Sequence, residues 1–192
     1  MTTEIGRPRN PQIDDAVLRA TVELIGETPY AELTVGAIAV RAGTSKPAIY
    51  RRWPSKAHLV HEAVFPSGEP TLMPHTGSMA DDLREMLRRT ADVWTAPAAR
   101  AAMPGLMGEI SADPTLHAVL LERFYEGVFG TIHDRLVEAS ERGEVRPGVD
   151  PAVLIETIAG ATLMALLIRS TDHLDDDWVE QTADLLTKGI CP

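Results

Sequence analysis

Five basic side chains that could contact an anion lie close together in the first third of the chain. No acidic residue occurs from position 33 to 61. Residues 1–66 hold eight Lys or Arg and seven Asp or Glu, net +1, whereas residues 67–192 hold 10 and 21, net −11. This asymmetry suggests a small segment that meets an anion, attached to an acidic body that does not. A solvated basic face would carry the same charge, so the residue pattern must decide. The five residues are Arg41, Lys46, Arg51, Arg52 and Lys56.

The sequence offers no pattern typical of an enzyme or a metal site. Its six histidines form no H-E-x-x-H motif or other tight metal-ligand spacing, and G-x-S-x-G, Walker A and G-x-G-x-x-G motifs are missing. The run Asp175–Asp177 is explained more simply as an acidic helix start. The one cysteine, Cys191, excludes an internal disulfide and a Cys-rich metal site, and it fits a reducing compartment. We therefore expect no catalysis, no metal and no cofactor.

Residues 34–53, TVGAIAVRAGTSKPAIYRRW, have the pattern of a helix-turn-helix. Thr34 and Ser45 are suited to cap two short helices, and Gly43 can adopt the backbone conformation that the turn requires. Ala39 is small enough for the second helix to cross closely over it. Ile49 would pack into the angle between the two helices. A generic helical hairpin could show the same small, glycine and aliphatic residues by chance.

The same segment resembles the TetR-like family of transcriptional regulators. The resemblance is close from Gln12 to about Val64, and its most specific part is the run A-G-T-S-K-P-A-I-Y-R-R-W-P-S-K at positions 42–56. It implies that residues 46–53 form a recognition helix in the major groove of DNA. The remaining two thirds of the chain resembles the family only in architecture, an all-helical regulatory domain whose last two helices usually form a dimer interface.

The resemblance and the chemistry of the side chains together assign a DNA-binding set. Lys46 could donate to guanine, and Ala48 could touch a thymine methyl group. The resemblance assigns Thr34, Tyr50 and Lys56 to phosphates. Arg51 and Arg52 could add phosphate contacts, although one of them could simply be solvated, and Trp53 fits the core better than a stacking role. The expected set is Arg7, Arg9, Thr34, Thr44, Ser45, Lys46, Pro47, Ala48, Tyr50, Arg51 and Lys56, in which the two arginines of the N-terminal arm would reach the minor groove.

Apolar periodicity and capping residues predict an all-α fold of about nine helices. Residues 1–66 would form the N-terminal arm and a three-helix DNA-binding domain, and residues 67–192 a helical ligand-binding and dimerisation domain. A helix over 98–111 is expected to be interrupted near Pro104–Gly105. The expected helices cover residues 12–27, 35–42, 46–53, 56–64, 78–94, 98–111, 114–142, 151–169 and 176–188.

Residues 152–168 are apolar on almost every side, which predicts a buried helix. Gly160, Ala161 and Ala165 would permit close approach of a second subunit. Helices near 151–169 and 176–188, the latter with Trp178, Leu185 and Leu186, would then build a homodimer interface of four helices. A purely intramolecular core helix is the alternative. The segment is too polar for a membrane span, no secretory signal is visible, and we expect a cytoplasmic protein.

The regulatory domain is expected to hold a pocket for a small, largely apolar effector. Methionine and aromatic side chains would line it, with His117 and Tyr125 as polar groups. The function so predicted is a ligand-responsive regulator, a repressor in the first place, that binds a palindromic operator as a homodimer. An all-helical protein-interaction module without DNA binding is the alternative. The expected lining is Met86, Trp94, Met103, Met107, His117, Phe124, Tyr125, Val128 and Met164, with Phe129 beside it.

Overall fold

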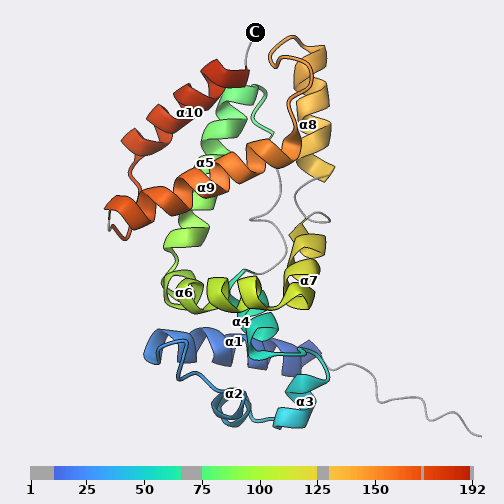
Figure 1. Ribbon diagram of the computed structural model, residues 1–192, viewed down its shortest axis with the longest axis vertical. Coiled ribbons are helices and arrows are strands. Elements are labelled where there is room, and N and C mark those ends of the chain that lie inside the picture. The colour runs from blue at the N-terminus through green and yellow to red at the C-terminus, as the bar shows by residue number, and fades with distance from the viewer. Residues whose placement is uncertain (1–10, 66–74, 125–129, 170, 191–192) are drawn as a thin grey trace, which may run out of the picture. The chain divides into compact units, whose positions relative to one another are not determined.

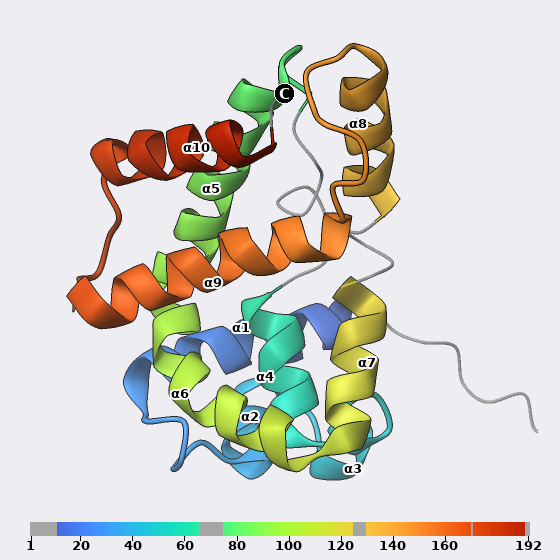
Figure 2. The same cartoon turned by 45° about the horizontal axis from the view of Figure 1, so that its top comes forward.

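The computed structural model describes residues 11–65, 75–124, 130–169 and 171–190, and every regular element in these ranges is a helix (Figures 1 and 2). The predicted all-α fold is thus confirmed. Contacts divide the chain into two compact units, residues 1–66 with 101–112 and residues 67–100 with 113–192. One boundary between the units lies after Pro66, and the last twelve residues of helix α6 (Pro97–Ala112) group with the N-terminal unit.

The N-terminal unit is a small bundle in which α1 packs against α2 and α4, and α2 packs against α3. Apolar residues at helical spacing in α1, among them Val17, Leu24 and Ile25, are buried there. Serine or threonine side chains cap α2, α3 and α4, as predicted. The helices are α1 (Pro11–Glu27), α2 (Val35–Arg41), α3 (Lys46–Tyr50) and α4 (Lys56–Val64).

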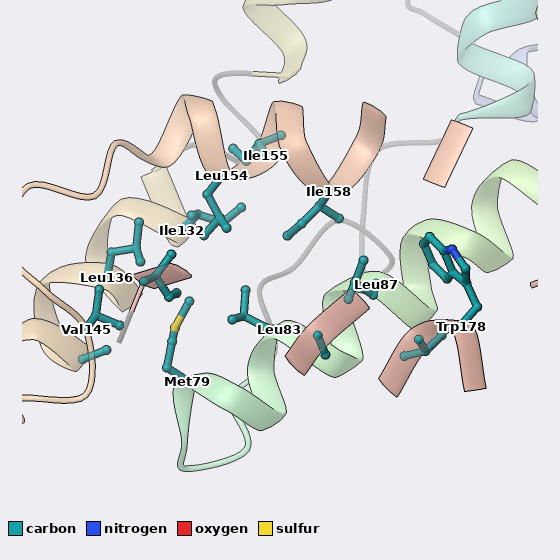
Figure 3. Packing of buried hydrophobic residues seen from close by; sticks show 14 residues of the cluster. Met79, Leu83, Leu87, Ile132, Leu136, Val145, Leu154, Ile155, Ile158 and Trp178 are labelled. Atoms are coloured by element: carbon teal, nitrogen blue, oxygen red, sulfur yellow. The ribbon is translucent and has the colours of Figure 1, made fainter. Parts of the chain in front are cut away.

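The C-terminal unit is organised around α5 (Met79–Thr95), against which α9 (Pro151–Arg169) and α10 (Asp176–Ile190) pack. Leu83 and Leu87 of α5 face Leu154 and Ile158 of α9 in the apolar core (Figure 3). Trp178 also belongs to this core at 8% exposure. Its expected place in a subunit interface is therefore wrong, because α10 turns this ring toward its own chain.

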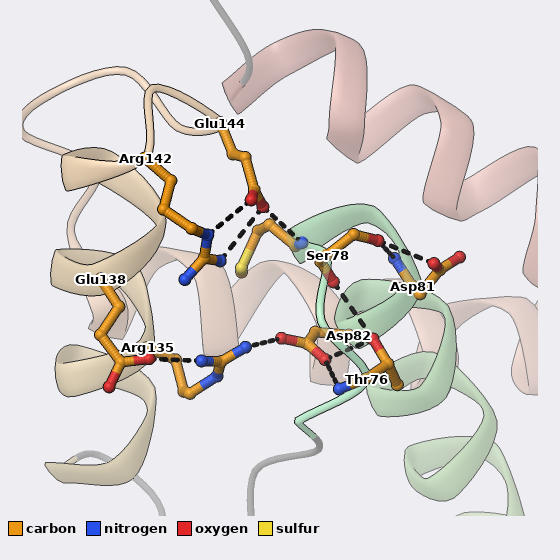
Figure 4. A network of polar contacts seen from close by, with 9 residues as sticks. Thr76, Ser78, Asp81, Asp82, Arg135, Glu138, Arg142 and Glu144 are labelled. Carbon is orange, nitrogen blue, oxygen red and sulfur yellow. Dashed lines mark hydrogen bonds and ion pairs between the residues drawn. The ribbon is translucent and has the colours of Figure 1, made fainter.

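A polar network ties the start of α5 to α8 (Gly130–Glu141) and the loop after it (Figure 4). The buried Asp82 carboxylate accepts hydrogen bonds from Arg135 and from the backbone and hydroxyl of Thr76. Glu144 accepts from the backbone N–H of Met79 at 2.9 Å, at the first turn of α5. The Met79 N–H is thus met by a carboxylate and the Asp81 N–H by the Ser78 hydroxyl, in accordance with the helix dipole.

Two helix predictions need correction. Helix α6 runs without interruption from Pro97 to Ala112, although Pro104 lies inside it. Pro104 is exposed, so the carbonyl that loses its helical partner can be hydrated. The single helix expected from 114 to 142 is instead α7 (Pro114–Phe124) and α8, on either side of residues 125–129, which lie outside the described part. The structure therefore has ten helices in its described ranges rather than about nine.

Helix α9 is the one described helix long and apolar enough to cross a bilayer, a criterion that core helices of globular proteins also meet. Only one of its sides is buried in the chain, with Leu154, Ile155, Ile158 and Thr162. The opposite side carries apolar residues that are exposed in the described part of the chain. Val153, Met164, Leu167 and Ile168 are 57%, 53%, 66% and 75% exposed.

Candidate nucleic-acid interface

The turn between α2 and α3 is built by local hydrogen bonds. The Thr34 hydroxyl accepts from the Ala37 N–H at 3.1 Å and starts α2, and the Ser45 hydroxyl accepts from the Ala48 N–H at 3.3 Å and starts α3. Gly43 lies between them with φ +65°, a conformation that other residues rarely adopt. These three residues hold the two helices at the separation that the sequence predicted.

The inner side of the helix pair is apolar and closely packed. Ala39 is 3% and Ile49 1% exposed, so the small residue and the aliphatic residue meet the core as expected. Trp53 is also buried, which confirms its core assignment over a stacking role. Because Ile49 fixes one side of α3, the other side must face solvent.

That solvent-facing side carries most of the residues expected to contact DNA. Ser45, Lys46, Pro47, Tyr50 and Arg51 are exposed, and Tyr50 keeps half of its surface in contact with water. The remaining members in this region are Thr34, which is exposed at the start of α2, and Thr44 and Ala48, which are half-buried. The structure thus brings the predicted recognition residues onto one accessible surface of two short helices.

Lys46 lies back across Gly36 at the start of α2. A Cβ built on Gly36 would stand 3.0 Å from Lys46 Nζ and 3.7 Å from Thr34 Oγ1. The ammonium and the Thr34 hydroxyl therefore lie on the same side of the turn. Contact of Lys46 with DNA stays a prediction.

Three of the five basic residues are engaged within the protein. Arg41 forms ion pairs with Glu23 at 3.2 Å and Glu27 at 2.8 Å. The hydrogen bonds that Arg41 donates to Glu27 and Glu23 raise the pKa of Arg41 further above its ordinary value. Arg52 pairs with Asp14 of α1 and donates to the Ala48 carbonyl. Within the described residues Lys46 and Arg51 form no ion pair, so the cationic charge available to a ligand is concentrated on α3.

Lys56, the third of these, does not extend into solvent as the phosphate assignment suggests. Its Nζ donates to the Tyr30 carbonyl at 3.0 Å, lies 4.0 Å from the centre of the Tyr30 ring, and is 3.6 Å from Glu109 Oε1 of α6. The side chain is 21% exposed. Tyr30 and Glu109 were not foreseen, because Glu109 lies more than fifty positions further along the chain and no local pattern links them.

The residues expected to line the pocket differ in their burial. Met86 packs against the core of the C-terminal unit, and Trp94 and Met103 are half-buried. The side chains of Met107, His117 and Met164 are exposed, which does not suit an enclosed lining. Tyr125, Val128 and Phe129 lie outside the described residues, as does the side chain of Phe124. Arg7 and Arg9 of the DNA-binding set also lie outside them.

Comparisons with known proteins agree with this geometry. Residues 17–63 match the family described as bacterial regulatory proteins, tetR family, and residues 73–186 match the tetracyclin repressor-like C-terminal domain. The uncharacterized HTH-type transcriptional regulator Rv1556 of Mycobacterium tuberculosis is 32% identical over 174 residues, covering 88% of this chain and 83% of that protein. YdeS of Bacillus subtilis, named in the same way, is 28% identical over 191 residues, covering 99% and 96%.

A solved structure leads to the same family. The crystal structure of the TetR family transcription regulator SCO0332 superposes with a TM-score of 0.66 at 29% identity, covering 94% of this chain and 100% of that one. One explanation therefore accounts for the helix-turn-helix, the helical C-terminal unit and both family matches. The chain is a member of the TetR family of DNA-binding transcription regulators.

Proposed function

We propose that this regulator is a repressor that binds a palindromic operator as a homodimer and is released by a small, largely apolar effector. The observation that carries the proposal is the exposed side of α3, which presents Ser45, Lys46 and Tyr50 beside Thr34 while Ile49 anchors it. Hydroxyls and an ammonium at helix starts are the groups that proteins use to hold phosphates and position a recognition helix. Residues 67–192 carry a net charge of −11, which does not favour contact with phosphates.

The exposed apolar side of α9 supports the homodimer. Val153, Gly160, Met164, Leu167 and Ile168 follow one another at helical spacing, and no atom of a packed neighbour among the described residues lies within 4 Å of a Cβ placed on Gly160. An uncovered apolar stripe of this length is unfavourable in water and typical of an obligate interface. Leu185 of α10 is also an exposed apolar residue, at 74%. A second copy of the chain related by a two-fold axis would bury both stripes and space two α3 helices for a palindrome.

The effector would act by stabilising one of two arrangements of the dimer. Only a ligand that binds the two arrangements with different affinity can change the DNA affinity. Met86 and Trp94, half-buried residues of the C-terminal unit, remain the best described candidates for its contacts. We place this regulator in the cytoplasm, where the operator would be accessible.

Selection of genomic fragments by the purified protein tests the proposal. We expect enrichment of a few fragments that share an inverted repeat and a stoichiometry of two chains for each repeat. Addition of an inducing compound should lower this affinity. Enrichment of no fragment over input DNA at low ionic strength would overturn operator binding, and enriched fragments without an inverted repeat would overturn the two-fold arrangement.

A further inference from the structure

The ammonium of Lys56 is held in a junction between three segments of the N-terminal unit. Lys56 is the first residue of α4, Tyr30 precedes α2, and Glu109 belongs to α6. The Tyr30 carbonyl and ring and the Glu109 carboxylate surround Nζ at 3.0, 4.0 and 3.6 Å. A cation over an aromatic face, with a carboxylate beside it, is a complete set of partners for an ammonium.

Tyr30 fixes the geometry of this junction. Its side chain is 7% exposed, and its ring lies on Gly105 of α6, one helical turn before Glu109. Burial raises the pKa of the Tyr30 hydroxyl above its ordinary value, and the nearby Glu109 carboxylate raises it further. The tyrosine therefore stays neutral and carries no charge that would replace Glu109 as the partner of Lys56.

The junction conflicts with DNA binding by Lys56. A phosphate that reaches Nζ must either displace the Glu109 carboxylate or share the ammonium with it at the cost of repulsion between two anions. Glu109 is 42% exposed and is not held by a second cation among the described contacts. If Glu109 leaves, the carbonyl and ring of Tyr30 remain to hold Lys56 for the incoming phosphate.

We propose that Glu109 is an autoinhibitory carboxylate that competes with a DNA phosphate for Lys56, so that α6 weakens DNA binding when its Glu109 is seated in this junction. The proposal rests on the proposed function, because it requires that the N-terminal unit binds a duplex. Any change that withdraws α6 from Tyr30 also withdraws Glu109 and raises the affinity. Any change that holds α6 more firmly against Tyr30 lowers the affinity for DNA.

Duplex affinity measured at several salt concentrations tests this inference. The probe is one fragment enriched from the genome together with a random-sequence duplex of the same length. Glu109→Gln removes the charge and keeps the shape, and Glu32→Gln, exposed in the same unit and without a contact to Lys56, is the matched control. We expect Glu109→Gln to bind both duplexes about two- to fivefold more tightly, the range of an exposed ion pair. Its log K against log salt should be steeper by about 0.9 for each subunit that gains a phosphate contact.

A Lys56→Gln background separates this effect from general repulsion of DNA. There, Glu109→Gln should change the affinity no more than Glu32→Gln does. Glu109→Ala should reproduce the gain of Glu109→Gln, and circular dichroism checks the fold of each variant. If Glu109→Gln binds like Glu32→Gln, or if its gain persists without Lys56, the competition is wrong while DNA binding stands. If the wild-type protein binds no duplex, the proposed function itself fails and the inference with it.

Discussion

The ring of Tyr30 rests on Gly105 so closely that a methyl group at position 105 would overlap the ring carbons. This contact fixes α6 against the loop that precedes α2 and explains why a glycine is tolerated in the interior of a helix. Tyr30 is buried at 7% exposure. The relationship makes position 105 a sensitive probe of the N-terminal unit.

We expect Gly105→Ala to destabilise the protein by about 1–3 kcal/mol, the usual range for overpacking, although alanine favours the helix. Gly108 lies three residues further along α6 with nothing within 4 Å of a Cβ, so Gly108→Ala is the matched control. That control should be neutral or stabilising by up to about 1 kcal/mol. Urea unfolding measures both. Equal stability of the two variants would show that Tyr30 does not rest on α6 in solution.

Acid should weaken the C-terminal unit through the network at the start of α5. Hydrogen bonds from Arg142 and from the Met79 N–H lower the pKa of Glu144 from 4.5 to about 2. Burial raises the pKa of Asp82, but its hydrogen bonds with Thr76 and Arg135 outweigh this and lower it overall. A carboxyl whose pKa is lowered by folding stabilises the protein above its ordinary pKa, and this contribution is lost as pH falls toward the folded value.

The free energy of unfolding should therefore fall between about pH 4.5 and 2. Glu144→Gln should lower the stability at neutral pH and flatten this dependence, because the glutamine does not titrate. Glu122→Gln, at an exposed position of α7, serves as the control and should leave the slope unchanged. Denaturant unfolding at a series of pH values gives the comparison. A slope that Glu144→Gln and Glu122→Gln affect equally would contradict the role of Glu144.

A charge on the exposed side of α9 should separate the subunits. Leu167→Glu places a carboxylate near the C-terminal end of the apolar stripe, and burial of that charge without a partner is strongly unfavourable. Sedimentation should then detect a monomer at concentrations where the wild-type protein is a dimer, and operator affinity should fall with it. Val137→Glu introduces the same charge at an exposed valine of α8 and should leave the dimer intact. If the Leu167→Glu variant remains dimeric, the subunit interface does not lie on this side of α9.

The sequence was most informative where the structure is local. Thr34, Gly43 and Ser45 act on neighbours within three or four residues, so their types alone predicted the turn. Asp113 is a further local cap, whose carboxylate accepts from the N–H groups of Thr115 and Leu116 at the start of α7. Capping is a property of a few consecutive residues, and it does not depend on distant segments of the chain.

The predictions were wrong where the surroundings of a residue in the folded chain determine its structure. Pro104 was expected to break α6, but its exposed position lets the helix continue. Trp178 was assigned to a subunit interface, because composition does not tell which side of α10 faces its own chain. Lys56 has the residue type and helix position of a phosphate ligand, yet Glu109 and Tyr30 determine its surroundings. Long-range pairs of this kind leave no periodic signal in a single sequence.

The most direct test of DNA recognition by α3 is the affinity of a Lys46→Ala variant for an enriched genomic fragment and for a random duplex of equal length. Arg19→Ala, which removes the same charge from an exposed position of α1, is the control. We expect Lys46→Ala to weaken binding to the enriched fragment by about 1–3 kcal/mol and to shallow its salt dependence, while Arg19→Ala changes little. Binding by Lys46→Ala that equals that of the wild-type protein on both duplexes at every salt concentration would contradict the assignment of α3 to the DNA interface.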